Sequence, residues 1–197
     1  MFLHSTASLP RLLSLFRRQH PGVHVSMFVG NTEQVSQGVA DMRFTLGFID
    51  GPLHVADLQA EQFRQGEMVP VVALDHPLIG KKRLSNADFC DQPLLMHELG
   101  SGTRELLETK LKRERIHSGS IVEFSNTEAL KQVAIHGGGI AWLPRVSMPR
   151  ELEDGLLIPL PARHLTIRRP LSVIRRMGGH TGPVAEAFLG LLQEDAG

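Results

Sequence analysis

Apolar residues along the chain switch between helix-like and strand-like spacing. Residues 9–19, LPRLLSLFRRQ, carry leucines and Phe16 at intervals of three and four, which predicts a helix that Pro21-Gly22 ends. Residues 23–29, VHVSMFV, place apolar side chains mostly at alternate positions, which predicts a strand. Residues 44–49, FTLGFI, form an apolar run that is typical of a buried strand.

The same alternation continues to the end of the chain. Further strands are predicted at residues 67–74, 93–97, 120–124, 140–143, 154–160 and 169–177, and helices after residues 31–32 and at 85–89, 104–115, 127–136, 145–153 and 184–194. Strands that alternate with helices predict an α/β protein with a mostly parallel sheet. No internal repeat, low-complexity block or long linker interrupts this pattern.

Composition narrows the class of protein. The chain has 197 residues, 42% of them hydrophobic, which suffices for one domain or two small lobes with a real core. Lys plus Arg and Asp plus Glu number 21 each, so the formal net charge is zero. Nucleic-acid-binding domains are usually strongly basic, so we expect no nucleic-acid surface within this chain. A net charge of zero also gives no reason to expect a membrane surface as partner.

The N-terminal sequence and the cysteine content bear on the compartment. The stretch MFLHSTASLPRLL has no basic region before its apolar residues and reaches Pro10 early, unlike a secretory signal. No apolar run approaches the roughly 20 residues of a spanning helix. The single cysteine, Cys90, cannot form an internal disulfide and fits a reducing compartment. These features predict a soluble cytoplasmic protein.

Four polar turns stand where helices are expected to begin. They are HSTAS at residues 4–8, GNTEQ at 30–34, GSGTRE at 100–105 and SNTEA at 125–129. In open α/β sheets, ligands bind beyond the carboxyl ends of strands, next to helix N-termini whose free N–H groups and dipole favour an anion. These turns are therefore the candidate binding loops.

Each turn has a structural alternative, because Ser, Thr and Asn before a helix are most often only caps. Capping is the favoured interpretation for Asn31-Thr32 and for Asn126-Thr127, each taken alone. The turn at residues 100–103 holds four small or hydroxyl residues where a cap needs one, and there binding is favoured over capping. Arg104 could hold a carboxylate ligand, but an ion pair with Glu108, one helical turn later, is the favoured role.

No arrangement typical of an enzyme or a metal site is found. Residues 136–139, HGGG, match a lipase oxyanion string, but the chain has no G-x-S-x-G nucleophile elbow, so a helix stop and a tight turn are expected. The ten histidines are scattered singly and form no ligand cluster. We predict no catalytic residue, no cofactor and no metal.

Taken in order, these motifs resemble the effector-binding domain of LysR-type transcriptional regulators. The matching stretches cover almost the whole chain: LPRLLSLFRRQHPGVHV, GNTEQV, LGFIDGP, VVALDHPL, GSGTRELLE, SNTEALKQVAIHGGGIAWLPR, GLLIPLP and RRPLSVIRR. The resemblance implies an α/β, two-lobed fold like that of type 2 periplasmic binding proteins, with mixed sheets flanked by helices. It also implies two crossing strands between the lobes and a small effector in the cleft between them.

The resemblance further implies how the chain is organised. Lobe I would take about residues 1–72 and 145–197, and lobe II about residues 73–144. Regulators of this family form homodimers through this domain, and a tetramer is expected for the full-length protein. DNA would be bound only through an N-terminal winged helix-turn-helix that this chain does not contain. The strand before the first helix is expected to be cut short at Met1.

The family's effector lies against the helix-start loops, as the polar turns suggested. No covalent chemistry is implied, and the expected effector is small and anionic. The alternatives are a free-standing solute-binding protein for a small oxyanion or organic acid and, as a third class, an enzyme on the same fold. The residues onto which the effector site is carried are Ser5, Thr6, Asn31, Thr32, Gly100, Ser101, Gly102, Thr103, Asn126 and Thr127.

Overall fold

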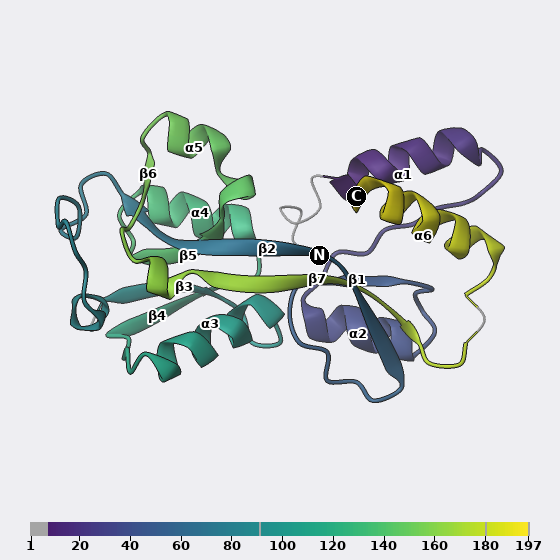
Figure 1. The fold of residues 1–197 in the computed structure, drawn as a ribbon, viewed down its shortest axis with the longest axis horizontal. Coiled ribbons are helices and arrows are strands. Elements are labelled where there is room, and N and C mark those ends of the chain that lie inside the picture. Colours follow the sequence, from purple (N-terminus) through teal and green to yellow (C-terminus); the bar gives the residue numbers. More distant parts are fainter. Residues whose placement is uncertain (1–7, 91, 180, 197) are drawn as a thin grey trace. The chain divides into compact units, whose positions relative to one another are not determined.

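The chain divides into two compact units in the computed structural model, which describes residues 8–90, 92–179 and 181–196. Unit 1 holds the described residues up to Gln65 and those from Pro170 onward, and unit 2 holds Gly66–Arg169. The chain passes from one unit to the other along β2 (Leu58–Ala73) and returns along β7 (Ile167–Arg176) (Figure 1). The expected pair of crossing strands is thus present.

The strands form a mixed sheet in the order β1-β7-β2-β5-β3-β4, with β6 also paired to β2. The shorter strands are β1 (Gly47–Ile49), β3 (Pro93–His97), β4 (Ser120–Phe124), β5 (Ile140–Pro144) and β6 (Leu157–Pro159). β3 runs parallel to β4 and β5, whereas β2 runs antiparallel to β5 and β6, and β1 antiparallel to β7. The sheet is therefore mixed rather than mostly parallel, because β2 and β7 reverse the strand direction.

Unit 2 is a sheet with a helix on each face. α3 (Gly102–Arg113) and α4 (Thr127–Ile135) lie on opposite sides of β3 and β5 (Figure 1). Leu94 and Met96 of β3 pack into one apolar cluster with Leu107 of α3, and Leu95 packs into the other with Leu130 of α4. Successive strand residues point to opposite faces of the sheet, so the buried side chains of β3 contribute to both clusters.

Unit 1 is built around α1 (Ser8–Gln19), α2 (Thr32–Ala40) and α6 (Pro183–Ala196). α1 and α6 lie side by side, and Phe16 meets Phe188 edge to face with ring centroids 5.4 Å apart. These rings pack with Leu12 of α1 and Val173 of β7 in one cluster. The predicted helix 9–19 is confirmed almost to the residue.

The remaining elements are short. They are η1 (Asn86–Phe89), η2 (Arg145–Ser147), α5 (Pro149–Glu153) and η3 (Arg163–Leu165). The single helix predicted at 145–153 is therefore wrong, because Pro149 excludes a helical conformation for Met148 and starts a new helix. Across the described ranges, no helix is long and apolar enough to cross a membrane.

Among the described residues, no strand is assigned at the predicted position 23–29. These residues carry no assigned secondary structure, although their sequence alternates as a strand does. A strand needs a hydrogen-bonded neighbour, and no described strand pairs with this segment. The predicted strand at 44–49 is likewise reduced to Gly47–Ile49, while the one predicted at 67–74 begins earlier, at Leu58.

The two units differ in their boundaries from the expected lobes. Residues 145–169 were expected in lobe I, but they fall in unit 2. Their strand β6 pairs with β2 from Val71 to Ala73, and Leu165 packs in the same cluster as Trp142, whose indole N–H donates to the Leu165 carbonyl at 3.0 Å. These contacts hold the segment in unit 2.

Candidate functional site

Two helix N-termini meet at one edge of the unit 2 sheet. β3 and β4 are parallel neighbours and end in register, with His97 opposite Phe124, and the Glu98 N–H donates to the Phe124 carbonyl at 2.9 Å. The chain then turns into α3 after β3 and into α4 after β4. Because both strands run in the same direction, the two turns lie at the same, carboxyl edge of the sheet.

The first of these turns presents hydroxyls that do not cap. Ser101 occupies the N-cap position of α3, but its side chain makes no capping hydrogen bond. Ser101 and Thr103 are only 3% and 4% exposed, and within the described chain neither hydroxyl has a hydrogen-bond partner. Gly100 has φ +83°, which a residue with a side chain rarely adopts, and Gly102 is buried at the start of the helix.

The second turn contains both a capping side chain and a buried hydroxyl without a partner in the described chain. Asn126 Oδ1 accepts hydrogen bonds from the backbone N–H groups of Glu128 at 2.7 Å and Ala129 at 3.1 Å. The capping role favoured for Asn126 is thus confirmed. Thr127 is 4% exposed, and its hydroxyl lacks a partner among the described residues.

The buried hydroxyls of Ser101, Thr103 and Thr127 distinguish this edge of the sheet. A buried hydroxyl without a hydrogen bond costs roughly 1–3 kcal/mol, and most buried polar groups are satisfied. A bound molecule that accepts hydrogen bonds would satisfy these groups, with the helix dipoles favouring a negative charge. We call these three residues, with Gly100 and Gly102, the unit 2 hydroxyl site.

Arg104 does not contribute a free cation to this site. Its guanidinium donates to Glu108 Oε1 at 2.6 Å, to Glu123 Oε1 at 2.6 Å and to the His97 carbonyl at 3.1 Å. Burial disfavours the charged form, but the hydrogen bonds to the two carboxylates outweigh it and raise the pKa of Arg104. The favoured pairing with Glu108 is confirmed, and Glu123 is a further partner.

The turn in unit 1 is a complete helix cap. Asn31 Oδ1 accepts from the Gln34 N–H at 2.9 Å, and Gln34 Oε1 accepts from the Asn31 N–H at 3.0 Å, which together form a capping box. The favoured capping role of Asn31 is thus confirmed, and Thr32 is the first residue of α2. Ser5 and Thr6 lie outside the described residues.

The HGGG string is confirmed as a helix stop. His136 is the C-cap of α4, and the chain then turns through residues with left-handed backbone. At Gly139, with φ +143°, a side chain would also collide with the Pro93 carbonyl, because a Cβ would lie 2.4 Å from that oxygen. Within the described ranges, no three His, Cys, Asp or Glu side chains group closely enough to hold a metal ion.

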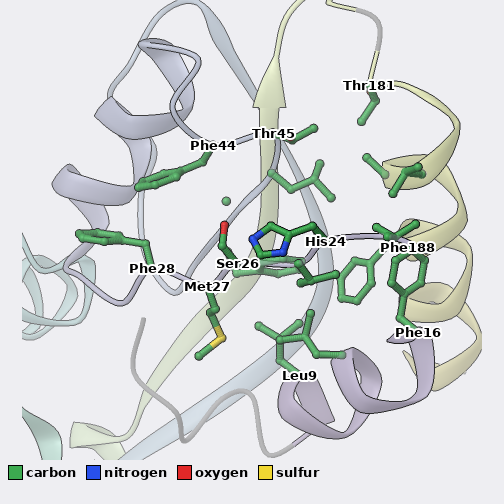
Figure 2. Close-up of a pocket in the computed structure, with 18 of the residues that line it drawn as sticks. Leu9, Phe16, His24, Ser26, Met27, Phe28, Phe44, Thr45, Thr181 and Phe188 are labelled. Atoms are coloured by element: carbon green, nitrogen blue, oxygen red, sulfur yellow. The ribbon is translucent and has the colours of Figure 1, made fainter. Parts of the chain in front are cut away.

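Two further features lie outside the predicted site. His97 precedes the glycine turn, where the sequence allows a histidine that faces a cleft but favours a structural or solvent-facing one; it ends β3 and is only 5% exposed, so it does not face solvent. The second feature is a cavity of about 420 Å³ within unit 1, and none of the predicted site residues that the structure describes lines it. Figure 2 shows it between Phe28 and Phe44 on one side and Phe16 and Phe188 on the other.

Known proteins resemble this chain over nearly its whole length. The family model described as LysR substrate binding domain matches residues 4–197. The HTH-type transcriptional regulator CbbR of Rhodospirillum rubrum is 35% identical over 187 residues, which are 95% of this chain and 62% of the relative. The HTH-type transcriptional activator CmpR of Synechocystis sp. is 31% identical over 184 residues, 93% of this chain and 60% of the relative. The chain thus spans about three fifths of the length of these regulators.

A solved structure confirms the fold. The regulatory domain of CcmR from Synechocystis PCC6803, in complex with 2-PG, superposes with a TM-score of 0.87 at 26% identity, covering 99% of this chain and 94% of that one. These similar proteins are transcriptional regulators, which does not favour the alternative of a free-standing solute-binding protein. The expected two-unit α/β fold, the order of motifs and these similarities agree, and the chain belongs to the LysR substrate-binding-domain family.

Proposed function

We propose that this chain is the ligand-sensing domain of a LysR-type transcriptional regulator and that it binds a small anionic effector at the unit 2 hydroxyl site. The observation that carries this proposal is the set of three buried hydroxyls without partners at two neighbouring helix N-termini. Membership of the family supports a regulatory role, and the CcmR regulatory domain was solved with a small molecule, 2-PG.

The chemistry of the site supports an anion held by hydrogen bonds. The hydroxyls of Ser101, Thr103 and Thr127 can all donate hydrogen bonds, and the N-termini of α3 and α4 lie at the same edge of the sheet. Arg104 already forms ion pairs with Glu108 and Glu123. The negative charge of the ligand would therefore be recognised by the dipoles of the two helices. This arrangement favours a small oxyanion or carboxylate over a large, multiply charged ligand.

Regulation follows from differential binding. An effector changes the activity of a regulator only if it binds one of two conformations more tightly, and it then shifts the population toward that conformation. In the whole protein, the domain would act through homodimers or tetramers in the cytoplasm, with DNA bound by a separate N-terminal domain. No step of this mechanism requires covalent chemistry.

A ligand screen by thermal shift tests the proposal. The panel holds sulfate, sulfite, phosphate, nitrate, small carboxylates, amino acids, aromatic acids and 2-PG at moderate ionic strength. A ligand at a hundred times its dissociation constant stabilises the fold by about 2.7 kcal/mol, which raises the melting temperature by several degrees. We expect a selective response to one class of anion.

Matched variants locate the binding. Ser101→Ala and Thr103→Ala should each weaken the affinity for the responding anion by roughly tenfold, the equivalent of one hydrogen bond to a charged group. Ser36→Ala is the control, because the Ser36 hydroxyl is equally buried without a partner in the described chain but lies within α2. Equal affinity in all three variants and the wild-type chain would refute the site.

A further inference from the structure

Positive charge is concentrated in unit 2 around the C-terminal end of α3. The helix begins at the hydroxyl site and, with 12 residues at 1.5 Å each, ends roughly 18 Å away from it (Figure 1). Residues 81–90, 110–117 and 163–164 meet at that end. They contain eight Lys and Arg against two acidic residues, or three with Asp91, which follows in the sequence. The whole chain, by contrast, has 21 of each.

Contacts between segments far apart in the chain hold this region together. The side-chain amide of Asn86 donates to the Glu114 carbonyl at 2.9 Å, and the Asn86 side-chain oxygen lies 2.8 Å from Nε2 of His164. Leu84 and Leu165 pack in the same apolar cluster. The charges are therefore neighbours in space, although three separate parts of the sequence supply them.

Most of these cations are not neutralised by an acid. Lys81 pairs with Asp88 at 2.5 Å and Lys110 with Glu114 at 2.7 Å, and the lysine hydrogen bonds lower the pKa of both carboxyl groups. The other cations are exposed, and none of them forms an ion pair with a described residue. We call these six the basic surface: Lys82, Arg83, Lys112, Arg113, Arg115 and Arg163.

Helix stability accounts for only part of this charge. Cations in the last turn of a helix interact favourably with its dipole, and α3 has three of them there. That role does not extend to Lys82 and Arg83, which lie in the loop before η1, to Arg115, which follows the helix, or to Arg163 in η3. Like charges held close together repel one another, so a bound polyanion would stabilise this arrangement.

The side chains around the charges indicate which kind of polyanion fits. Protein interfaces are usually anchored by aromatic or other apolar side chains that become buried. Among the described residues of the three segments, no large hydrophobic side chain is exposed. The phosphate backbone of DNA needs no apolar anchor, because Lys and Arg bind it through charge and the release of counterions. The basic surface therefore fits DNA better than it fits an acidic protein.

We propose that the basic surface of unit 2 binds the phosphate backbone of double-stranded DNA without sequence preference. The choice of DNA rests on the regulatory function proposed above, which the similarity to HTH-type regulators supports. The contact would add affinity to the sequence recognition of a separate N-terminal domain. The net charge of zero does not reveal this surface, because acidic residues elsewhere in the chain balance it.

Fluorescence anisotropy of a labelled DNA duplex of mixed sequence tests this assignment on the chain of residues 1–197. If about four phosphates are neutralised, the affinity should fall roughly a hundredfold between about 50 mM and 200 mM salt. The triple variant Lys82→Glu/Arg113→Glu/Arg115→Glu should bind at least about tenfold more weakly at the lower salt concentration. Its slope of log affinity against log salt should be smaller by about three, one for each lost phosphate contact.

The matched control is Arg17→Glu/Arg18→Glu/Arg150→Glu, which changes the net charge equally at exposed arginines outside the basic surface. It should keep most of the affinity of the wild-type chain. Equal losses in the two triple variants would show an effect of net charge alone and would overturn the proposal. Absence of binding by the wild-type chain at the lower salt concentration would overturn it as well.

Two further measurements separate the remaining explanations. Tighter binding of poly-glutamate than of the duplex would assign the basic surface to an acidic protein segment instead. Fluorescence of Trp142, which lies in unit 2, verifies that unit 2 is folded in each variant. If the glutamate variant does not fold, Lys82→Gln/Arg113→Gln/Arg115→Gln replaces it and should also weaken binding. The anion screen tests the hydroxyl site separately, so the two proposals can fail independently.

Discussion

At the scale of single residues, the same kind of polar turn serves two different purposes. Asn31 and Asn126 use their side-chain oxygens to cap helices, whereas the hydroxyls of Ser101, Thr103 and Thr127 are buried without a partner in the described chain. An asparagine oxygen reaches the free N–H groups of the first turn, which stabilises the helix without any ligand. The unpartnered hydroxyls instead lower stability until something binds them.

This difference predicts opposite effects on stability in the absence of ligand. Asn126→Ala should lower the free energy of unfolding by about 1 kcal/mol, because two N–H groups lose their acceptor. Ser101→Ala should leave it unchanged or raise it by up to about 1 kcal/mol, because an unsatisfied buried hydroxyl is removed. Urea unfolding of the two variants, followed by circular dichroism, provides both values. A loss of 1 kcal/mol or more in Ser101→Ala would mean that the hydroxyl is a structural cap.

At the scale of elements, α4 is anchored by a buried lysine. The Lys131 ammonium donates to Glu151 Oε1 at 2.5 Å and to the Ser147 carbonyl at 3.3 Å, and it lies 2.9 Å from Glu128 Oε2. These contacts tie α4 to η2 and α5, while the lysine side chain is only 7% exposed. The helix that carries Thr127 is thereby held at its middle as well as at its cap.

Removing this anchor should cost more than removing an ordinary surface pair. Lys131→Met should lower the free energy of unfolding by roughly 1–3 kcal/mol, because Glu151 is left partly buried without its partner. Lys110→Met, which breaks an ion pair with Glu114 on α3, is the matched control and should cost about 0.5 kcal/mol or less. Chemical denaturation measures both, and equal losses would contradict an anchoring role for Lys131.

The ion pairs of Lys131 should also make the stability of the fold depend on pH in the alkaline range. Burial disfavours its charged form, but the hydrogen bonds to Glu151 and Glu128 outweigh this and raise the pKa of Lys131 above its usual 10.5. A group whose pKa is higher in the folded state contributes its full stability below the unfolded pKa and loses it as the pH rises through the folded pKa. Unfolding free energies measured from pH 9 upward should therefore fall more steeply in the wild-type chain than in Lys131→Met. Parallel pH profiles would disprove this linkage.

At the scale of the whole molecule, the two units differ in how the chain builds them. Unit 2 is one continuous segment with apolar clusters on both faces of its sheet, whereas unit 1 is assembled from two segments and contains the cavity. A continuous segment with its own core can fold by itself. Trp142 is the single tryptophan of the chain, it is 2% exposed, and the chain has no tyrosine, so its fluorescence reports on unit 2 alone.

We expect a fragment of residues 66–169 to fold independently. In urea, its Trp142 fluorescence should show one cooperative transition with a midpoint close to that of the same signal in the full chain, because the indole packs on Phe89 and donates to Leu165 within the fragment. The variant Leu94→Asp, which places a charge in the core, serves as the unfolded reference. A fragment with the red-shifted emission of that reference would show that unit 2 depends on unit 1.

Much of this architecture follows from the sequence alone. The helix at 9–19, the strands at 93–97 and 120–124, and the helix stop at His136–Gly139 depend on local spacing, caps and glycines, which act within a few residues. The order of these motifs also indicated the family, since it reflects the order of elements in the fold. Local patterns likewise distinguished the turn at residues 100–103 from the simple helix caps at Asn31 and Asn126.

Only the tertiary structure decided which of these local patterns would be realised. Residues 23–29 alternate like a strand, yet a strand forms only where a neighbour supplies hydrogen bonds, and no described strand does so. Ser101 and Asn126 both precede helices. In the folded protein the Asn126 side chain caps its helix, whereas the Ser101 hydroxyl is buried without a partner in the described chain. Residues 145–169 joined unit 2 because they pair with β2, a contact between segments far apart in the chain. Sequence therefore determined the elements, because their causes are local, and the structure determined pairing and burial, because those depend on distant segments.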